Sequence, residues 1–95
     1  MARYLTLLRF TDQGARALSQ SASRAAAFRK AAEQAGVKVE AQYWTVGSYD
    51  GVLILSADTQ ENVLRTLAKL SAEGNVRTQT LQALTADEFA AVTGR

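Results

Sequence analysis

Two segments of this chain, RYLTLLRF (residues 3–10) and VLILSA (residues 52–57), are apolar at consecutive positions. Successive side chains of a β-strand point to opposite faces of the sheet, so a strand that is apolar at both parities needs cover on both faces. In the first segment Leu5 and Leu7 fall on one face, and Leu8 falls on the other. The pattern therefore predicts two strands in the middle of a sheet whose two faces are both covered.

The rest of the chain predicts where these strands lie in a fold. Apolar periodicities predict four strands, over residues 3–10, 37–46, 52–57 and 75–84. They also predict helices over residues 22–35 and 58–73 and a short last helix from residue 85 onward. In chain order, the first six are the elements of a ferredoxin-like β-α-β-β-α-β sandwich, an antiparallel sheet of strand order 4-1-3-2 with both helices on one face. This order makes the two apolar strands central. No Pro-, Gly- or Ser-rich linker divides the chain, so residues 1–95 are expected to form one α+β domain.

Local signals define the first helix and the strand after it. Ser21 is a candidate N-cap, and Gly36 suits the left-handed position that follows a last helical turn. A further helical turn is possible at residues 12–18. Strand 37–46 alternates between apolar and polar residues, which predicts one face made of Val37, Val39, Ala41 and Tyr43.

The later helices also carry start and stop signals. Asp58 and Glu61 have the spacing of a capping box at the start of the second helix, which is expected to end at Gly74. Its buried stripe is expected to be Val63, Leu64, Leu67 and Leu70. Thr85 and Glu88 form a second capping box, which predicts the start of a short C-terminal helix.

The two main helices of this fold cover only one face of the sheet, yet the central strands are apolar on both. The side chains left over would form a patch of a few hundred Å², which is near the limit for a monomer. Packing of two sheets face to face around a two-fold axis would cover it, so we expect a homo-oligomer formed through the open sheet face. The alternative is that the C-terminal helix folds back over part of that face.

A glycine-rich interruption separates the second and third strands. The sequence GSYDG (residues 47–51) supplies residues that tolerate the backbone of a tight hairpin. A turn alone does not account for the aromatic residues around it, which are Tyr43, Trp44 and Tyr49.

Three separated stretches, LLRFTDQG, YWTVGSYDGVLIL and GNVRTQTLQALT, resemble the GYD domain family, small bacterial proteins with a Gly-x-Tyr-Asp signature. The signature here is Gly47, Tyr49 and Asp50, and the resemblance covers nearly the whole chain. Gly51 is a mild departure, because the family often continues directly into the strand. The family resembles the dimeric α+β barrel group, whose members pair sheet to sheet, so the resemblance implies a dimer. It implies no catalytic residues, since the family has no established activity.

Four residues are the candidates for a ligand-binding site: Trp44, Tyr49, Asp50 and Arg77. Asp50 and Arg77 begin strands that run parallel on either side of the first strand, so both fall near one end of the sheet. A carboxylate and a guanidinium there could pair bidentately or bind a small polar ligand. The alternatives are that Asp50 bonds loop amides, that Arg77 lies at a dimer rim, and that Trp44 packs in a core or interface.

Composition excludes several classes of function. Histidine and cysteine are absent, so the commonest metal ligands and general base are missing, and no metal or cofactor is predicted. Eleven cations against nine anions give a net charge of +2 with no basic run, and strand 52–57 has no aromatic residue for base stacking. Nucleic-acid binding is therefore not expected. Arg9 and Asp12 come too early for a secretory signal, and no run of eighteen apolar residues occurs, so we expect a cytoplasmic protein without membrane contact.

Two classes of function remain. The first is a small self-assembling protein that binds a small-molecule ligand, either between helices and sheet or inside the dimer. The second is a cofactor-free enzyme similar to the monooxygenases or isomerases of the dimeric α+β barrel group, with Tyr49, Asp50 and Arg77 as candidate groups. Fold analogy alone does not establish an activity.

Overall fold

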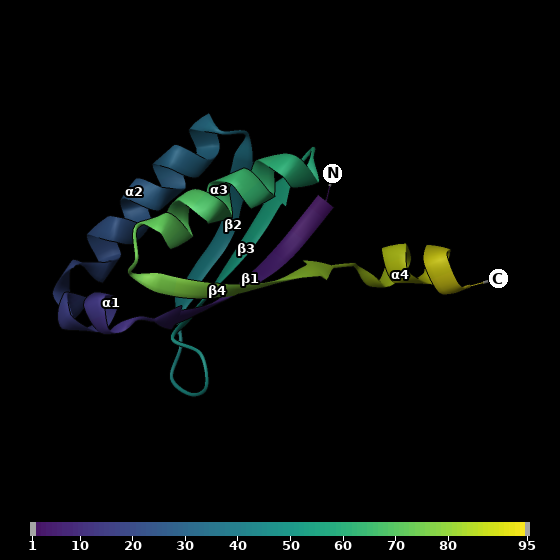
Figure 1. Cartoon of the computed structure of the whole chain (residues 1–95). Helices are drawn as coiled ribbons and strands as arrows, with labels where there is room; N and C mark the ends of the chain where they lie inside the picture. The colour runs from purple at the N-terminus through teal and green to yellow at the C-terminus, as the bar shows by residue number, and fades with distance from the viewer. Residues whose placement is uncertain (1, 95) are drawn as a thin grey trace.

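The computed structural model describes residues 2–94, and its elements follow the predicted order (Figure 1). They are β1 (Ala2–Phe10), α1 (Asp12–Arg16), a 3-10 turn (Leu18–Gln20), α2 (Ser21–Gln34), β2 (Val37–Trp44), β3 (Gly51–Ala57), α3 (Gln60–Ala72), β4 (Val76–Ala83) and α4 (Ala86–Thr93). The extra helical turn expected at residues 12–18 is α1. Gly36 and Gly74 have φ of 84° and 83°, which confirms them as the residues that end α2 and α3.

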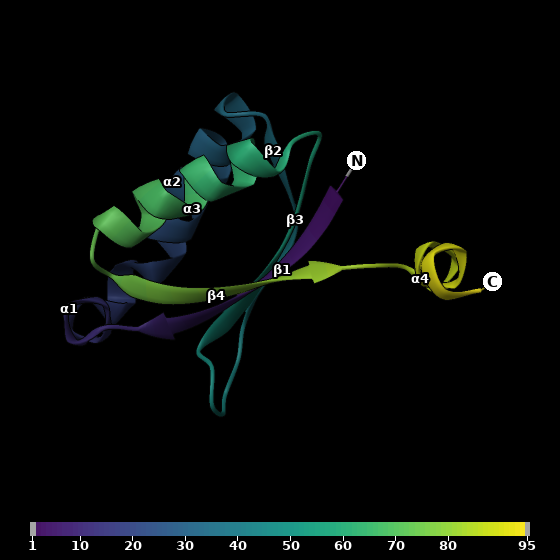
Figure 2. The ribbon, with the colours of Figure 1, turned by 45° about the vertical axis from the view of Figure 1, so that its right-hand side comes forward.

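The four strands form one antiparallel sheet in the order β2-β3-β1-β4, which confirms the predicted order. Both α2 and α3 lie against the same face (Figure 2). We call the opposite side of the sheet the open face. The strand register places six large apolar side chains on it: Leu5, Leu7, Tyr43, Val52, Ile54 and Leu81. The excess of apolar residues predicted for the central strands therefore lies on a side that no helix covers.

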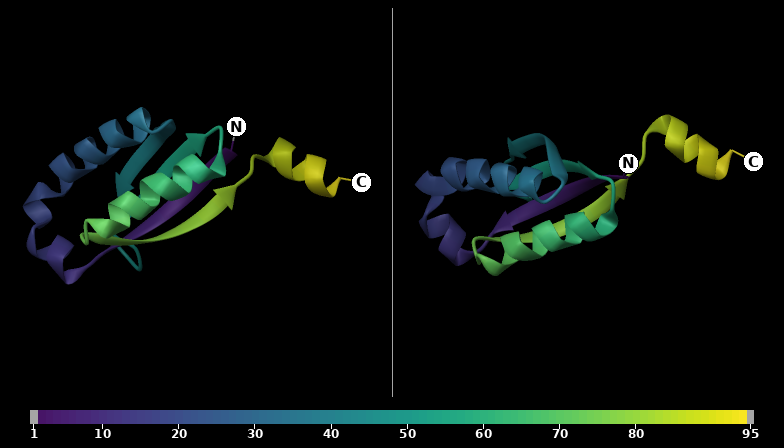
Figure 3. Two further views of the ribbon diagram at one scale, coloured as in Figure 1. Left: turned by 45° about the horizontal axis from the view of Figure 1, so that its top comes forward. Right: turned by 90° about the horizontal axis from the view of Figure 1, so that it is seen from above.

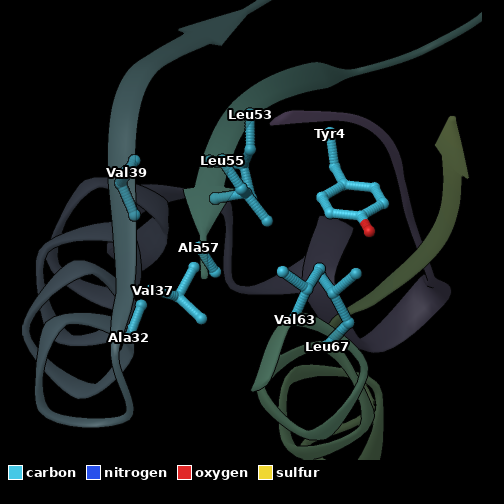
Figure 4. Packing of buried hydrophobic residues seen from close by; sticks show 9 residues of the cluster. All are labelled: Tyr4, Ala32, Val37, Val39, Leu53, Leu55, Ala57, Val63 and Leu67. Carbon is cyan, nitrogen blue, oxygen red and sulfur yellow. The ribbon is translucent and has the colours of Figure 1, made fainter. Parts of the chain in front are cut away.

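The core lies between the sheet and the two helices. Leu53 and Leu55 on β3 are almost fully buried, and Val63 on α3 is buried beneath them. Figure 4 shows the buried cluster to which they belong, whose side chains come from β1, β2, β3, α2 and α3: Tyr4, Ala32, Val37, Val39, Leu53, Leu55, Ala57, Val63 and Leu67. The helices thus bury one face of the central strands and leave the apolar side chains on the open face without a helix over them.

β2 contains an irregularity that changes which way its last residues face. The register with β3 shifts between Val39 and Ala41, which is the signature of a β-bulge at Glu40. The prediction that Val39 and Ala41 share a face was therefore wrong, because one extra residue reverses the parity of everything after it. The Ser56 hydroxyl donates to the Glu40 carboxylate at 2.8 Å. This bond, with a smaller contribution from Lys38, holds the pKa of Glu40 below its ordinary value.

Three predicted helix details were wrong. Ser21 is already helical and caps nothing, because the preceding 3-10 turn runs directly into α2. The N-cap of α3 is Thr59, whose hydroxyl accepts from the Asn62 amide at 3.3 Å, and not Asp58. Leu64 was expected in the buried stripe of α3 but is 56% exposed, and Thr66 is buried in its place.

The C-terminal helix α4 projects away from the rest of the domain (Figure 3). Its predicted capping box is confirmed, since Thr85 accepts from the Glu88 amide and the Glu88 carboxylate accepts from the Thr85 amide. Phe89 and Val92 are largely exposed on it. In this arrangement α4 leaves the open face of its own chain uncovered, so the alternative in which it folds back over the sheet is not what the structure shows.

Candidate functional site

Asp50 fixes the hairpin loop between β2 and β3 to the end of β1. Its carboxylate accepts a hydrogen bond from the Phe10 amide at 2.8 Å, and its own amide donates to the Leu8 carbonyl at 2.8 Å. Its carbonyl accepts from the Thr45 amide at 2.9 Å. The side chain and backbone of Asp50 therefore join three segments, and its carboxylate has a structural partner. The alternative in which Asp50 bonds loop amides is thus correct in kind, but the amide belongs to Phe10 at the end of β1 and not to the loop.

Tyr49, the residue before Asp50, lies toward the open face instead. The guanidinium carbon of Arg9 lies 4.8 Å from the centre of the Tyr49 ring, within the range of a cation–π contact. The Tyr49 hydroxyl donates to the Gln79 side-chain oxygen at 2.7 Å. Tyr49 thus bridges β1 and β4 across the end of the sheet, although no pattern in the sequence connects it with Arg9 or Gln79.

Arg77 lies beside this aromatic ring and directly opposite Arg9 in the pairing of β1 with β4. In the part of the chain that the structure describes, the ion pairs are Arg3–Glu88, Lys38–Glu40 and Arg65–Glu61. The first of the two arrangements considered for Asp50 and Arg77, a direct ion pair, is therefore not formed between these described residues. An open pocket of about 280 Å³ lies over the two arginines, and its lining is Leu7, Arg9, Tyr49, Arg77, Thr78 and Gln79.

Trp44 lies on the other side of the sheet, at the start of α2. Its indole nitrogen donates to the Ser21 hydroxyl at 2.9 Å, which explains what the Ser21 side chain does in place of capping. Trp44 is 52% exposed, and two other apolar side chains near this end, Leu18 and Val46, are 53% and 106% exposed. Val46 is in the hairpin loop, which extends beyond the sheet in Figure 2.

A cavity lies between α2 and the helix-covered face of the sheet. Apolar side chains including Phe28, Leu53 and Leu70 line it, and Trp44 and Asp50 are at its edge. Its volume is about 60 Å³. Ligand pockets are typically ~300–1,000 Å³, so this cavity is small for an ordinary ligand.

The four sequence-predicted residues are therefore near one end of the sheet, as expected, but on two sides of it. Tyr49 and Arg77 line the pocket on the open face, whereas Trp44 and Asp50 border the cavity on the helix side. Sequence reasoning missed Arg9, although its place two residues after Leu7 predicts that it shares the open face. No group of three or more acidic residues is placed to hold a metal ion within residues 2–94. None of the helices described there is long and apolar enough to cross a membrane.

The whole domain, including the hairpin loop, matches one known family. The model of the GYD domain matches residues 4–93. The chain belongs to the GYD domain family. This confirms the resemblance seen in the sequence, whose signature residues here form the anchored hairpin loop of the GYD domain.

Two relatives are similar over most of their length. A Thermus thermophilus protein named "Glutamine synthetase and cystathionine beta-lyase binding protein" is 34% identical over 85 residues, which is 88% of this chain and 90% of that protein. A crystal structure of a Thermus thermophilus protein superimposes with a TM-score of 0.56 at 26% identity, over 90% of this chain and 96% of the other.

Proposed function

We propose that this GYD-domain protein is a self-associating binding protein, in which two copies pack sheet to sheet through their open faces. The observation that carries the proposal is the uncovered apolar surface of the open face. Leu5, Leu7, Val52 and Ile54 occupy its centre, and Leu81 is 44% exposed beside them. Apolar surface of this kind on a sheet is normally buried against a second layer. The pairing would complete the ferredoxin-like, dimeric α+β barrel arrangement predicted from the sequence.

The other part of the proposal is that the assembly binds other proteins. The Thermus relative bears the name of a protein that binds two enzymes, and its similarity covers nearly all of this chain. Trp44 and Leu18 would stay accessible in a sheet-to-sheet dimer because they lie on the helix side. Exposed tryptophan is enriched among residues that dominate protein–protein binding. The bacterial, cytoplasmic setting predicted from the sequence is part of this proposal and is supported by the bacterial source of both relatives.

The geometry favours binding over the enzymatic alternative. Asp50 was one of the three candidate catalytic groups, but its carboxylate accepts from the Phe10 amide and holds the hairpin loop. The cavity beside it has a volume of only about 60 Å³, and the larger space that Asp50 borders, about 540 Å³, is an open depression on the surface beside Trp44 and Leu18. A small-molecule ligand remains compatible with the dimer, on the open face.

Substitution of Leu7 by aspartate tests the dimer, because it places a charge at the centre of the proposed interface. Light scattering after gel filtration should give a dimer for the parent protein and a monomer for Leu7→Asp. The matched control is Leu64→Asp, which adds the same charge at an exposed leucine on α3 and should stay dimeric. Leu81→Lys gives a second disruption at a more exposed position, in case Leu7→Asp does not fold. A monomeric parent, or dimers for both interface variants, would refute the pairing.

Substitution of Trp44 tests the partner surface. Binding would be measured with purified glutamine synthetase and cystathionine β-lyase from the organism that encodes this chain. Trp44→Ala should weaken binding by roughly thirtyfold, the loss that corresponds to about 2 kcal/mol at an interface hot spot. Leu64→Ala, on the outer face of α3, should leave it unchanged. If neither enzyme binds, or if Trp44→Ala binds as well as the parent, the Trp44 surface is not the docking site.

A further inference from the structure

Two arginines lie side by side on adjacent strands of the sheet, and no carboxylate within residues 2–94 forms an ion pair with either. Arg9 on β1 and Arg77 on β4 are register partners, and both are exposed. Like charges directly opposite on neighbouring strands repel each other. None of the ion pairs within residues 2–94 includes either guanidinium. Asp12 borders a neighbouring groove that Arg77 also lines, but it forms no ion pair with it. The positive charge at this place is therefore uncompensated by the described carboxylates of the chain.

The cluster around these arginines is ordered rather than free. The Arg9 guanidinium lies over the Tyr49 ring, and its N–H groups take part in none of the ion pairs within residues 2–94. The Gln79 oxygen accepts from the Tyr49 hydroxyl, so the Gln79 amide nitrogen is left as a donor at the same pocket. Asp50 does not line this pocket, since it borders the helix-side cavity. The polar side chains that converge here are thus mainly hydrogen-bond donors, and two of them are cationic.

Such a set of donors fits a planar oxyanion. A guanidinium matches the two oxygens of a carboxylate with parallel N–H···O bonds. An anion between Arg9 and Arg77 would replace their mutual repulsion by attraction to both.

The surroundings restrict the ligand further. Leu7 lines the pocket, and Leu5 and Val52 are the apolar neighbours of Leu7 on the open face. The pocket is therefore cationic at the end of the sheet and apolar toward its centre. We propose that the Arg9–Tyr49–Arg77 pocket binds the carboxylate of a small organic acid whose apolar body extends over Leu7 onto the open face.

This site rests on the proposed function in one respect only. In a sheet-to-sheet dimer the second copy would cover the apolar body of the ligand, whereas the carboxylate is held within one chain. A monomeric parent protein would refute the dimer but would leave binding of the carboxylate by the two arginines to be measured directly. The two proposals therefore fail independently.

Calorimetric titration with three probes tests the site: octanoate, octanamide and inorganic phosphate. Octanoate should bind, and octanamide should bind at least about tenfold more weakly, because the amide has the same length without the charge. Phosphate should also bind more weakly than octanoate, since it has no apolar part. Equal binding of octanamide would show that the arginines do not hold the head group. Equal binding of phosphate would show an anion site without the apolar component.

Charge-removing variants locate the binding on the chain. Arg77→Gln and Arg9→Gln should each weaken octanoate binding by at least about tenfold, with little effect on the stability of the protein without ligand. Lys69→Gln removes the same charge from an exposed position on α3 and is the matched control. Octanoate affinity that is unchanged in both arginine variants, or that falls equally in the lysine variant, would overturn the proposal.

Discussion

The hydrogen bond from the Phe10 amide to the Asp50 carboxylate is the contact whose loss has the clearest consequence. Substitution Asp50→Ala leaves the backbone bonds of residue 50 in place but removes the side-chain acceptor. The Phe10 amide is part-buried, so it loses a bond to a charged group and recovers only part of it from water.

The size of the effect follows from the kind of bond. Hydrogen bonds to charged groups contribute about 1.5–3 kcal/mol, and a middle value of about 2 kcal/mol is expected here. For a domain of this length each kcal/mol shifts the Tm by about 4–8 °C, so Asp50→Ala should lower it by about 8–16 °C. Asp50→Asn keeps an oxygen in the same place and should cost less than about 1 kcal/mol.

Thermal unfolding followed by circular dichroism measures this difference. All proteins must be compared at one concentration, because association makes the Tm of a dimer depend on concentration. Asp58→Ala is the matched control: Asp58 is exposed, and the cap of α3 beside it is Thr59. If Asp50→Ala unfolds at the same temperature as Asp58→Ala, the carboxylate does not anchor the hairpin and its role must be sought in ligand binding.

Two further predictions concern α1 and α4. Gly14 on α1 is buried, and a Cβ there would clash with the Asn75 carbonyl oxygen. Gly14→Ala should therefore lower the free energy of unfolding, measured by chemical denaturation, by about 1–3 kcal/mol. An unchanged free energy of unfolding would mean that α1 can shift to make room for the methyl group. The bond from the Thr85 amide holds the pKa of Glu88 below its ordinary value. The stabilisation from this cap is therefore complete above the pKa of an ordinary glutamate, about 4.3. It is lost as the pH falls through the lowered pKa of Glu88. The helical signal of α4 should fall in that range, and a Glu88→Gln variant should show no such step.

The order of elements could be predicted because each depends on nearby residues. Alternation and double-sided apolar runs define the strands, and glycine after α2 and α3 marks the ends of the helices. With seven elements in a known order, the rules of chain connection leave few sheets to choose from. The family resemblance agreed with this choice.

The bulge in β2 could not be predicted in the same way. Val37, Val39 and Ala41 have the even spacing of a regular strand, and nothing at Glu40 marks an extra residue. The bulge is a feature of the pairing of β2 with β3, and its effect reaches Trp44, which lies on the helix side as a result. A single shift in tertiary pairing thus decided the side on which a candidate residue lies.

Competition between equally suitable caps explains another error. Asp58 and Thr59 are both good N-cap residues, so local propensity does not choose between them. β3 continues to Ala57, and the chain needs Asp58 to leave the sheet before α3 begins. The hydroxyl of Thr59 is then the one placed at the first turn.

The candidate site shows the same division between what is local and what is tertiary. Convergence of Asp50 and Arg77 at one end of the sheet follows from strand direction and was predicted correctly. The side that Asp50 faces depends on the contact of the hairpin loop with the Phe10 amide, which the sequence did not reveal, whereas the side that Arg77 faces follows from its pairing with Arg9.

The two adjacent signature residues perform different tasks, and one depends on the other. The carboxylate of Asp50 fixes the hairpin loop to the end of β1 through the Phe10 amide. Fixed in this way, the loop directs the Tyr49 ring over Arg9 and its hydroxyl to Gln79. Loss of the Asp50 anchor should therefore weaken binding at the open-face pocket without touching any group that lines it. Asn at position 50 retains the anchor but not the charge. If Asp50 acts by position, Asp50→Ala should lose stability and bind octanoate more weakly, and Asp50→Asn should do neither. If Asp50 acted directly through its charge, Asp50→Asn would change octanoate binding as well.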